Sequence, residues 1–249
     1  MRSDATRAHY DRLAGTYEEN WIYSPALIEW TTEGIVQRLR PTSTTVVLDV
    51  GCGTGLYSRG LAVHAKAVVC ADPSEGMLSH LPADERLVPL RAGAEDIVAG
   101  RVPLPYDSYD AILLKEVVHH LPDLPATLAG LTRLLRPGGR FLVSMLPQDL
   151  GYPLFDAALR LFRRLQPDPG TVAGALTDAG LDVEISYDGF PVTFTRERYI
   201  EMVRGRYMSI LSTFSDAELE RGIDEIRGRY PGPDIRFAEP VAFVLGVRR

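Results

Sequence analysis

The chain has 249 residues, of which 45% are hydrophobic, and its formal net charge is −6. This length and composition favour one globular domain over residues 1–249, and the acidic balance gives no basic face that would bind nucleic acid. The two cysteines are too few for a disulfide scaffold or a cysteine-rich metal site, so no bound metal is expected. No apolar run is long enough to span a bilayer or resembles a signal peptide, which predicts a cytoplasmic protein without a membrane partner.

The N-terminal stretch 1–40 predicts a helical cover. One helix is expected near residues 7–13. A second helix begins after Ser24, a residue type that caps helix N-termini, with Pro25 in its first turn, and runs to Arg40.

A glycine loop follows a β-branched run and is the most informative segment. Residues 44–50 predict a strand, Gly51, Gly53 and Gly55 form the loop, and a helix opens at Leu56. Alternate glycines let the backbone turn sharply and let a ligand approach main-chain atoms beside the positive end of the next helix. The spacing differs from the dinucleotide loop Gly-x-Gly-x-x-Gly and from a P-loop, which disfavours a NAD-dependent oxidoreductase.

A second strand, 67–71, ends at Asp72-Pro73-Ser74. An acidic residue at the tip of the second strand of a doubly wound sheet can accept hydrogen bonds from both hydroxyls of a ribose, because a carboxylate offers two oxygens. We therefore predict that Asp72 is a ribose ligand. Ser74 is expected to cap a short helix that carries Met77 close to the base.

Three further segments continue the alternation of strands and helices. Residues 87–90 predict a weak third strand, 104–114 a turn and fourth strand, and 136–145 a helix stop and fifth strand. In this order, the segments over residues 44–146 resemble the class I S-adenosylmethionine-dependent methyltransferases, in the small-molecule or ubiquinone-biosynthesis-type branch (methyltransferase type 11).

The resemblance implies a fold and a cofactor. The fold is an α/β, Rossmann-like, doubly wound sheet of seven strands with the last strand antiparallel, a cofactor-binding core at 41–147, and N-terminal helices that cover the cofactor. The cofactor is S-adenosylmethionine, with S-adenosylhomocysteine as product. The expected cofactor-binding residues are Tyr10, Tyr17, Asp49, Gly51, Cys52, Gly53, Thr54, Gly55, Asp72, Pro73, Met77, Ala94, Glu95 and Lys115.

One family position differs in this chain. After the third strand the branch often carries Gly-Asp-Ala-Glu, whose aspartate binds the adenine amino group, and here Gly93 stands at that position. We expect the adenine contact to come from the Ala94 backbone together with Glu95 or Asp96.

Two histidines are candidates for catalysis. The sulfonium is already a strong electrophile, so the enzyme mainly aligns the reactants, and a base is needed only if the acceptor must lose a proton. His119 and His120 follow the fourth strand at the ligand-binding edge of the sheet, and imidazole titrates near neutrality. His119 resembles the base of some O-methyltransferases. The alternative is that both rings only pack. Lys115 and Glu116 are second-line candidates for the substrate-facing rim, and plain surface exposure is their alternative.

The C-terminal part predicts a helix at 153–165, a helix at 171–180, a strand at 181–186 and a last strand at 241–247. The segment 187–233 between these strands is too long for a hairpin. It contains one predicted helix near residues 195–207 and a second that begins at Ser215, where Ser215 and Glu218 form a capping-box pattern. We expect this segment to form a helical substrate lid.

Arginines of this lid have two interpretations. They could contact an acidic acceptor, but interleaved glutamates favour a solvated helix face. The residues concerned are Arg196, Arg198, Arg204 and Arg206.

The sequence thus predicts an enzyme that transfers a methyl group to a small-molecule acceptor, as a monomer or homodimer. The base-gripping Asn/Asp-Pro-Pro-aromatic signature of base-amino methyltransferases is absent after the fourth strand. Oxygen or carbon is the favoured acceptor atom and biosynthesis the favoured setting. The alternatives are an inactive S-adenosylmethionine-binding subunit and, less favoured, a NAD-dependent oxidoreductase.

Overall fold

The computed structural model describes residues 24–249. The predicted helix at 7–13 and the cofactor contacts of Tyr10 and Tyr17 lie outside the described residues. Among residues 24–249, none of the helices has both the length and the apolarity needed to cross a membrane.

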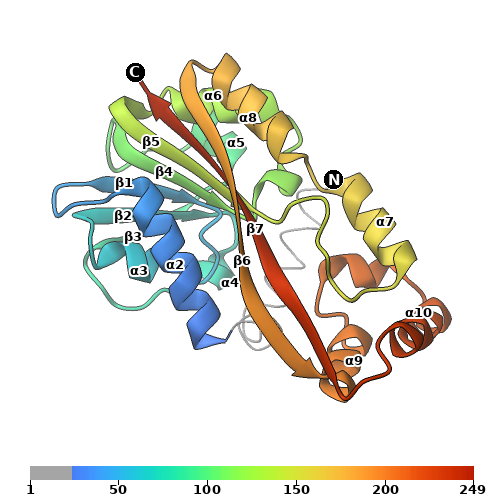
Figure 1. The fold of residues 1–249 in the computed structure, drawn as a ribbon. Coiled ribbons are helices and arrows are strands. Elements are labelled where there is room, and N and C mark those ends of the chain that lie inside the picture. The colour runs from blue at the N-terminus through green and yellow to red at the C-terminus, as the bar shows by residue number, and fades with distance from the viewer. Residues whose placement is uncertain (1–23) are drawn as a thin grey trace.

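A single sheet organises the described part of the chain (Figure 1). Its seven strands lie in the order β3-β2-β1-β4-β5-β7-β6, and β7 pairs antiparallel with both of its neighbours. The strands are β1 (Val46–Val50), β2 (Ala67–Asp72), β3 (Leu87–Arg91), β4 (Tyr109–Lys115), β5 (Leu135–Met145), β6 (Leu181–Thr195) and β7 (Asp234–Arg248). The predicted Rossmann-like sheet with an antiparallel last strand is confirmed.

Helices cover both faces of this sheet (Figure 1). They are α2 (Pro25–Leu39), α3 (Ser58–Ala62), α4 (Glu75–Leu78), α5 (Ala94–Val98), α6 (Leu124–Thr132), α7 (Asp156–Leu165), α8 (Pro169–Asp178), α9 (Arg196–Arg204) and α10 (Asp216–Arg229), with 3-10 turns η1 (Val118–His120) and η2 (Ser209–Thr213). Because successive strand side chains point to opposite faces, Leu48 of β1 packs with α5, α6 and α8, whereas Val47 packs with α2 and α3.

The start and end of α2 follow the sequence prediction. The Ser24 hydroxyl accepts a hydrogen bond from the Leu27 amide, and Pro25 occupies the first turn. The helix ends at Arg40, whose φ of 51° places it in the left-handed region. This helix lies against the sheet beside the first strand.

Strands β6 and β7 are longer than predicted. Their pairing continues to Thr195 and Asp234, so residues 187–195 are strand and the helical insertion is 196–233. The predicted last strand began at Val241, directly after Pro240, and proline is rare inside sheets. Here the pairing of β5 with β7 covers only residues 242–247 of β7, so at Pro240 this strand is paired on the β6 side alone.

The long hairpin of β6 and β7 supports a second hydrophobic core. We call the segments that form this core, other than the hairpin itself, the lid. Residues 146–165, α9, η2 and α10 pack on the outer half of the hairpin, away from the main core (Figure 1). Phe155 approaches α10 so closely that a Cβ on Gly222 would lie 2.4 Å from the Phe155 Cδ1. The predicted helix pair is present, and Ser215 forms the capping box with Glu218 that starts α10. The lid is therefore a packed unit rather than a loose loop.

Candidate functional site

The three glycines of the loop have different surroundings. Gly51, Gly53 and Gly55 have φ of +75°, +57° and +78°, a region that side chains rarely adopt. A Cβ on Gly51 would lie 2.4 Å from a methyl carbon of Val117, and one on Gly55 would lie 2.3 Å from Leu81. A Cβ on Gly53 would meet no atom of residues 24–249 within 4 Å. Gly53 is thus the glycine that leaves room for a ligand.

The tip of β2 is joined to this loop through Asp72. One carboxylate oxygen of Asp72 accepts from the Gly53 amide at 3.0 Å, and the other accepts from the Ser74 amide at 2.8 Å. The Ser74 hydroxyl in turn caps α4 by accepting from the amide of Met77, which is buried. The backbone therefore fixes the Asp72 carboxylate beside Gly53.

Asp49 lies beneath the loop. Its side chain is only 2% exposed and accepts from the Ser58 hydroxyl at 2.5 Å. Burial raises the pKa of Asp49 to about 7; the Ser58 hydrogen bond opposes this rise and the charge of Asp72 adds to it. A hydrogen bond with Cys70, burial and the nearby carboxylates raise the pKa of Cys52, so Cys52 is a thiol at neutral pH.

The turn after β3 lies beside the turn after β2. We call the loop 51–55, Asp72 and these two turns the cofactor cradle. Pro73 is exposed, and a Cβ on Gly93 would lie 4.0 Å from it, so the turns after β2 and β3 abut. The Asp96 carboxylate accepts from the Gly93 amide and from Arg101. Since Asp96 holds the helix start, the predicted adenine contact is left to Glu95 and the Ala94 backbone.

A charged pair stands at the end of β4. The Lys115 Nζ lies 3.4 Å from the Glu116 carboxylate and 5.4 Å from the centre of the Tyr57 ring. Burial lowers the pKa of Lys115, but Glu116, Tyr57 and Glu239 outweigh it, so the net shift is upward and the ammonium is retained. Glu116 has a φ of +55°, a left-handed conformation that non-glycine residues seldom adopt.

The two histidines form η1 just beyond this pair. Their ring centres lie 4.0 Å apart, and both side chains are exposed. Desolvation by the surrounding protein, together with the charge of Lys115, holds the pKa of His119 below its ordinary value. The imidazole of His119 is therefore neutral at physiological pH, which suits a base.

A small cavity of about 20 Å³ borders the loop. It is enclosed by α2, the segment after the loop, the ends of β4 and β5, and β7. Its lining residues are Leu27, Thr31, Tyr57, Lys115, Glu116, Leu146, Glu239 and Val241. Of the residues that the sequence analysis singled out, it contains Lys115 and Glu116, and neither histidine is among the described residues that line it.

Sequence reasoning missed Glu239, which lines this cavity, and Tyr152, which contacts Glu239. The Tyr152 hydroxyl donates to the Glu239 carboxylate at 2.5 Å. Burial raises the pKa of Glu239 to about 7, with Tyr152 and Lys115 opposing the rise and Glu116 adding to it. The signal that could have found Glu239 was the alternation of hydrophobic residues before Pro240, which marks the longer β7.

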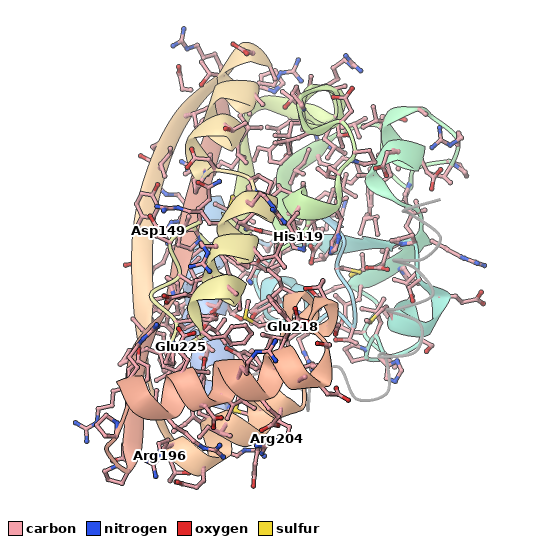
Figure 2. The ribbon with its side chains drawn as sticks, turned by 90° about the vertical axis from the view of Figure 1, so that its right-hand side faces the viewer. His119, Asp149, Arg196, Arg204, Glu218 and Glu225 are labelled. Atoms are coloured by element: carbon pink, nitrogen blue, oxygen red, sulfur yellow. The ribbon has the colours of Figure 1, made fainter. Side chains whose placement is uncertain are left out.

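The arginines of the lid are engaged in ion pairs. Arg204 contacts Glu220 at 2.7 Å, Arg206 contacts Asp216 at 2.7 Å, and Arg196 and Arg198 pair with Glu197 and Glu201 on their own helix. In Figure 2, Arg196 and Arg204 lie at the far end of the lid, well separated from His119. These contacts favour the solvated helix face over an acceptor site. Within residues 24–249, no three His, Cys, Asp or Glu side chains gather in a way that could hold a metal ion.

Comparison with known proteins agrees with this geometry. Residues 48–143 match the family model described as a methyltransferase domain. This matched domain belongs to the class I S-adenosylmethionine-dependent methyltransferases. It falls in the ubiquinone-biosynthesis-type branch predicted from the sequence, and S-adenosylmethionine is the cofactor of this class.

Two bacterial relatives and one solved structure illustrate the similarity. The chain is 32% identical over 164 residues to a ubiquinone biosynthesis O-methyltransferase of Xylella fastidiosa, covering 58% of this chain and 63% of that protein. It is 29% identical over 154 residues to a demethylmenaquinone methyltransferase of Clavibacter sepedonicus, covering 57% and 61%. A phosphoethanolamine N-methyltransferase of Haemonchus contortus, in complex with S-adenosylhomocysteine, shares the fold with a TM-score of 0.59 and 18% identity, over 96% of this chain and 57% of that one. The match thus spans about three-fifths of either bacterial relative.

Proposed function

We propose that this protein transfers the methyl group of S-adenosylmethionine to a small-molecule acceptor. The observation that carries the proposal is the open space over Gly53, which is bounded by the Asp72 carboxylate that the Gly53 amide itself holds. A cradle of this kind suits a nucleoside whose ribose binds a carboxylate at the tip of β2.

Each part of the cradle has a role in the proposal. The Asp72 carboxylate binds the ribose, Met77 and Pro73 flank the adenine, and the Ala94 backbone with Glu95 binds the adenine amino group. The loop residues 51–55, with Asp49 below them and Lys115 beside them, hold the amino-acid end. When bound, the cofactor supplies an electrophilic methyl group, and the protein aligns the acceptor with it.

The proposed class of acceptor rests on the cavity beside the glycine loop and on the names of two relatives. The cavity beside the loop is small and largely apolar, and the packed lid lies beyond it. The names of the two bacterial relatives support a biosynthetic acceptor and, in one case, transfer to oxygen. We further propose that the protein acts in the cytoplasm as a monomer or homodimer and does not act on nucleic acid. The assignment of His119 and His120 to catalysis stays a prediction.

A matched pair of glycine variants tests the cofactor assignment. Gly53 and Gly138 both have positive φ and both face open space, but Gly138 lies in β5 away from the loop. Calorimetry should show that Gly53→Val weakens S-adenosylmethionine binding by about 100-fold or more, because the side chain occupies ligand space, whereas Gly138→Val binds normally. Normal binding by folded Gly53→Val would contradict the proposal.

The alternatives are separated by two further measurements. A NAD-dependent oxidoreductase would bind NAD in the same calorimetric experiment, and we expect no NAD binding. An inactive cofactor-binding subunit would bind S-adenosylmethionine without producing S-adenosylhomocysteine from any member of an acceptor panel. Production of S-adenosylhomocysteine with one acceptor decides for the enzyme.

A further inference from the structure

A half-buried carboxyl group lines the cavity beside the loop. Glu239 lies on β7 opposite Phe190 of β6, where the hairpin leaves the core and enters the lid. Its carboxylate accepts from the hydroxyl of Tyr152, a side chain that is only 3% exposed. The tyrosine comes from the loop after β5. The two residues are therefore held in one geometry by two different elements.

Charged and phenolic groups surround this carboxyl from every side. Lys115 and Glu116 face it from the end of β4. Tyr199 of α9 and Tyr207 lie on the lid side, and their hydroxyls are hydrogen-bonded to each other at 3.0 Å. Burial raises the pKa of Glu239 to about 7 against the opposing effects of Tyr152 and Lys115. Both its charged and its neutral forms are thus populated near neutral pH, as a base that takes and returns a proton requires.

The cavity that Glu239 lines lies directly beside the cofactor cradle. Tyr57, which also lines it, is the second residue after Gly55. Glu116 lines it too and directly precedes Val117, whose methyl group packs against Gly51. The cavity has room for about one water-sized group, so an acceptor hydroxyl that enters it would lie beside the loop that the proposed function gives to S-adenosylmethionine.

The lining of the cavity indicates the chemistry of its ligand. Leu27, Leu146 and Val241 provide an apolar wall, and a carboxylate can only accept hydrogen bonds. The complementary ligand inserts one donor group into the cavity and rests an apolar body against this wall. A carboxylate that can hold a proton near neutrality suits a hydroxyl that must lose its proton to react.

We propose that Glu239 accepts the proton of the acceptor and that the acceptor is an apolar molecule with a phenolic or enolic hydroxyl. The inference rests on the proposed function. The hydroxyl oxygen forms a bond to the methyl carbon as the sulfur–methyl bond breaks and its electron pair stays on sulfur. The hydroxyl proton passes to the Glu239 carboxylate, and the products are a methyl ether and S-adenosylhomocysteine. Tyr152 is the positioning residue, because it holds the carboxylate and stabilises its charged form.

The test uses the full chain, S-adenosylmethionine and a probe panel of simple phenols with matched benzylamines. Methyl transfer is measured from pH 5.5 to 9 for the parent, Glu239→Gln and Tyr152→Phe. Glu184→Gln, on the exposed face of β6, is the matched control. Melting temperature and S-adenosylmethionine affinity are measured for each variant to confirm folding.

We expect the parent to methylate phenols, with a rate that falls as the pH drops through about 7. Glu239→Gln should lower the rate at pH 8 by about 10²–10⁴-fold and remove this pH dependence, with S-adenosylmethionine affinity unchanged. Tyr152→Phe should move the fall in rate to higher pH, because the lost hydrogen bond had favoured the charged carboxylate. A purely structural role would move neither pH profile.

Three outcomes would overturn the inference. The first is a Glu239→Gln rate within threefold of the parent rate, and the second is an unchanged pH profile in Tyr152→Phe. The third is a parent that binds S-adenosylmethionine but methylates no phenol, whether it methylates benzylamines or nothing in the panel. Should Glu239→Gln fail to fold, the Tyr152→Phe profile still decides. A parent that does not bind S-adenosylmethionine contradicts the proposed function instead.

Discussion

The cofactor cradle and the acceptor cavity are neighbours built in different ways. The cradle is local: Gly53 and Asp72 belong to consecutive strand ends, and a backbone hydrogen bond joins them. The cavity draws one wall each from α2, β4, β5 and β7, through Leu27, Lys115 and Glu239 among others. Backbone geometry thus fixes the cradle, whereas long-range side-chain packing fixes the cavity. The two should respond separately to mutation.

Disrupting the lid core should have the largest effect. A side chain on Gly222 would overlap Phe155, so Gly222→Val should destabilise the protein by about 3 kcal/mol and lower Tm by about 6–12 °C. Calorimetry should still show S-adenosylmethionine binding within twofold of the parent below that Tm. Gly228→Val, on the same helix with open space around it, is the control. Loss of cofactor binding in Gly222→Val would show that the two regions are coupled.

Removing the β2 carboxylate should have the next largest effect. Asp72→Ala should weaken S-adenosylmethionine binding by at least about tenfold, because it removes charge-assisted hydrogen bonds to the ribose and frees the Gly53 amide. Asp84→Ala removes an exposed aspartate that also accepts from a backbone amide, and should bind normally. Equal affinities in calorimetry of folded Asp72→Ala and Asp84→Ala would contradict the ribose assignment.

A smaller effect concerns the carboxyl beneath the loop. Burial raises the pKa of Asp49 to about 7, so the native state keeps a proton that the unfolded chain loses near pH 4. The resulting stability is fully present below pH 4 and is lost as the pH rises through 7. Asp49→Asn should therefore gain Tm relative to the parent, by about 2–8 °C between pH 5 and 7.5. A Tm difference independent of pH would show that Asp49 is charged in the native state.

The smallest effect should come from His119. If Glu239 is the base, His119→Ala should change the rate of methyl transfer by less than about threefold, since the ring does not line the cavity. Because the pKa of His119 is lowered to about 4, a rate governed by this residue would stay constant from pH 6 to 8. A loss of about 10²-fold or more, with intact cofactor binding, would return the base to His119.

The parts that sequence predicted well are those set by short-range geometry. Ser24 and Ser215 cap helices as their positions indicated, and the loop glycines adopt the positive φ that their spacing suggested. These features depend on residues only a few positions apart. The seven-stranded sheet with its antiparallel last strand followed from the resemblance of the whole core.

The acceptor side escaped prediction for two physical reasons. Pro240 concealed the outer half of β7, although a proline is tolerated where a strand is paired on one side only. The contact between Tyr152 and Glu239 joins residues 87 positions apart, and nothing local to either residue signals it. Only the folded hairpin brings them together beside Lys115.

The central claim is that the cofactor cradle and the acceptor cavity act separately. The most direct test measures cofactor affinity and methyl-transfer rate in parallel for Asp72→Ala and Glu239→Gln. The account predicts that Asp72→Ala weakens S-adenosylmethionine binding at least about tenfold but retains transfer at saturating cofactor. It predicts that Glu239→Gln binds the cofactor like the parent and loses transfer by about 10²-fold or more. Equal losses of cofactor affinity in the two variants, or transfer by Glu239→Gln at the parent rate, would contradict it.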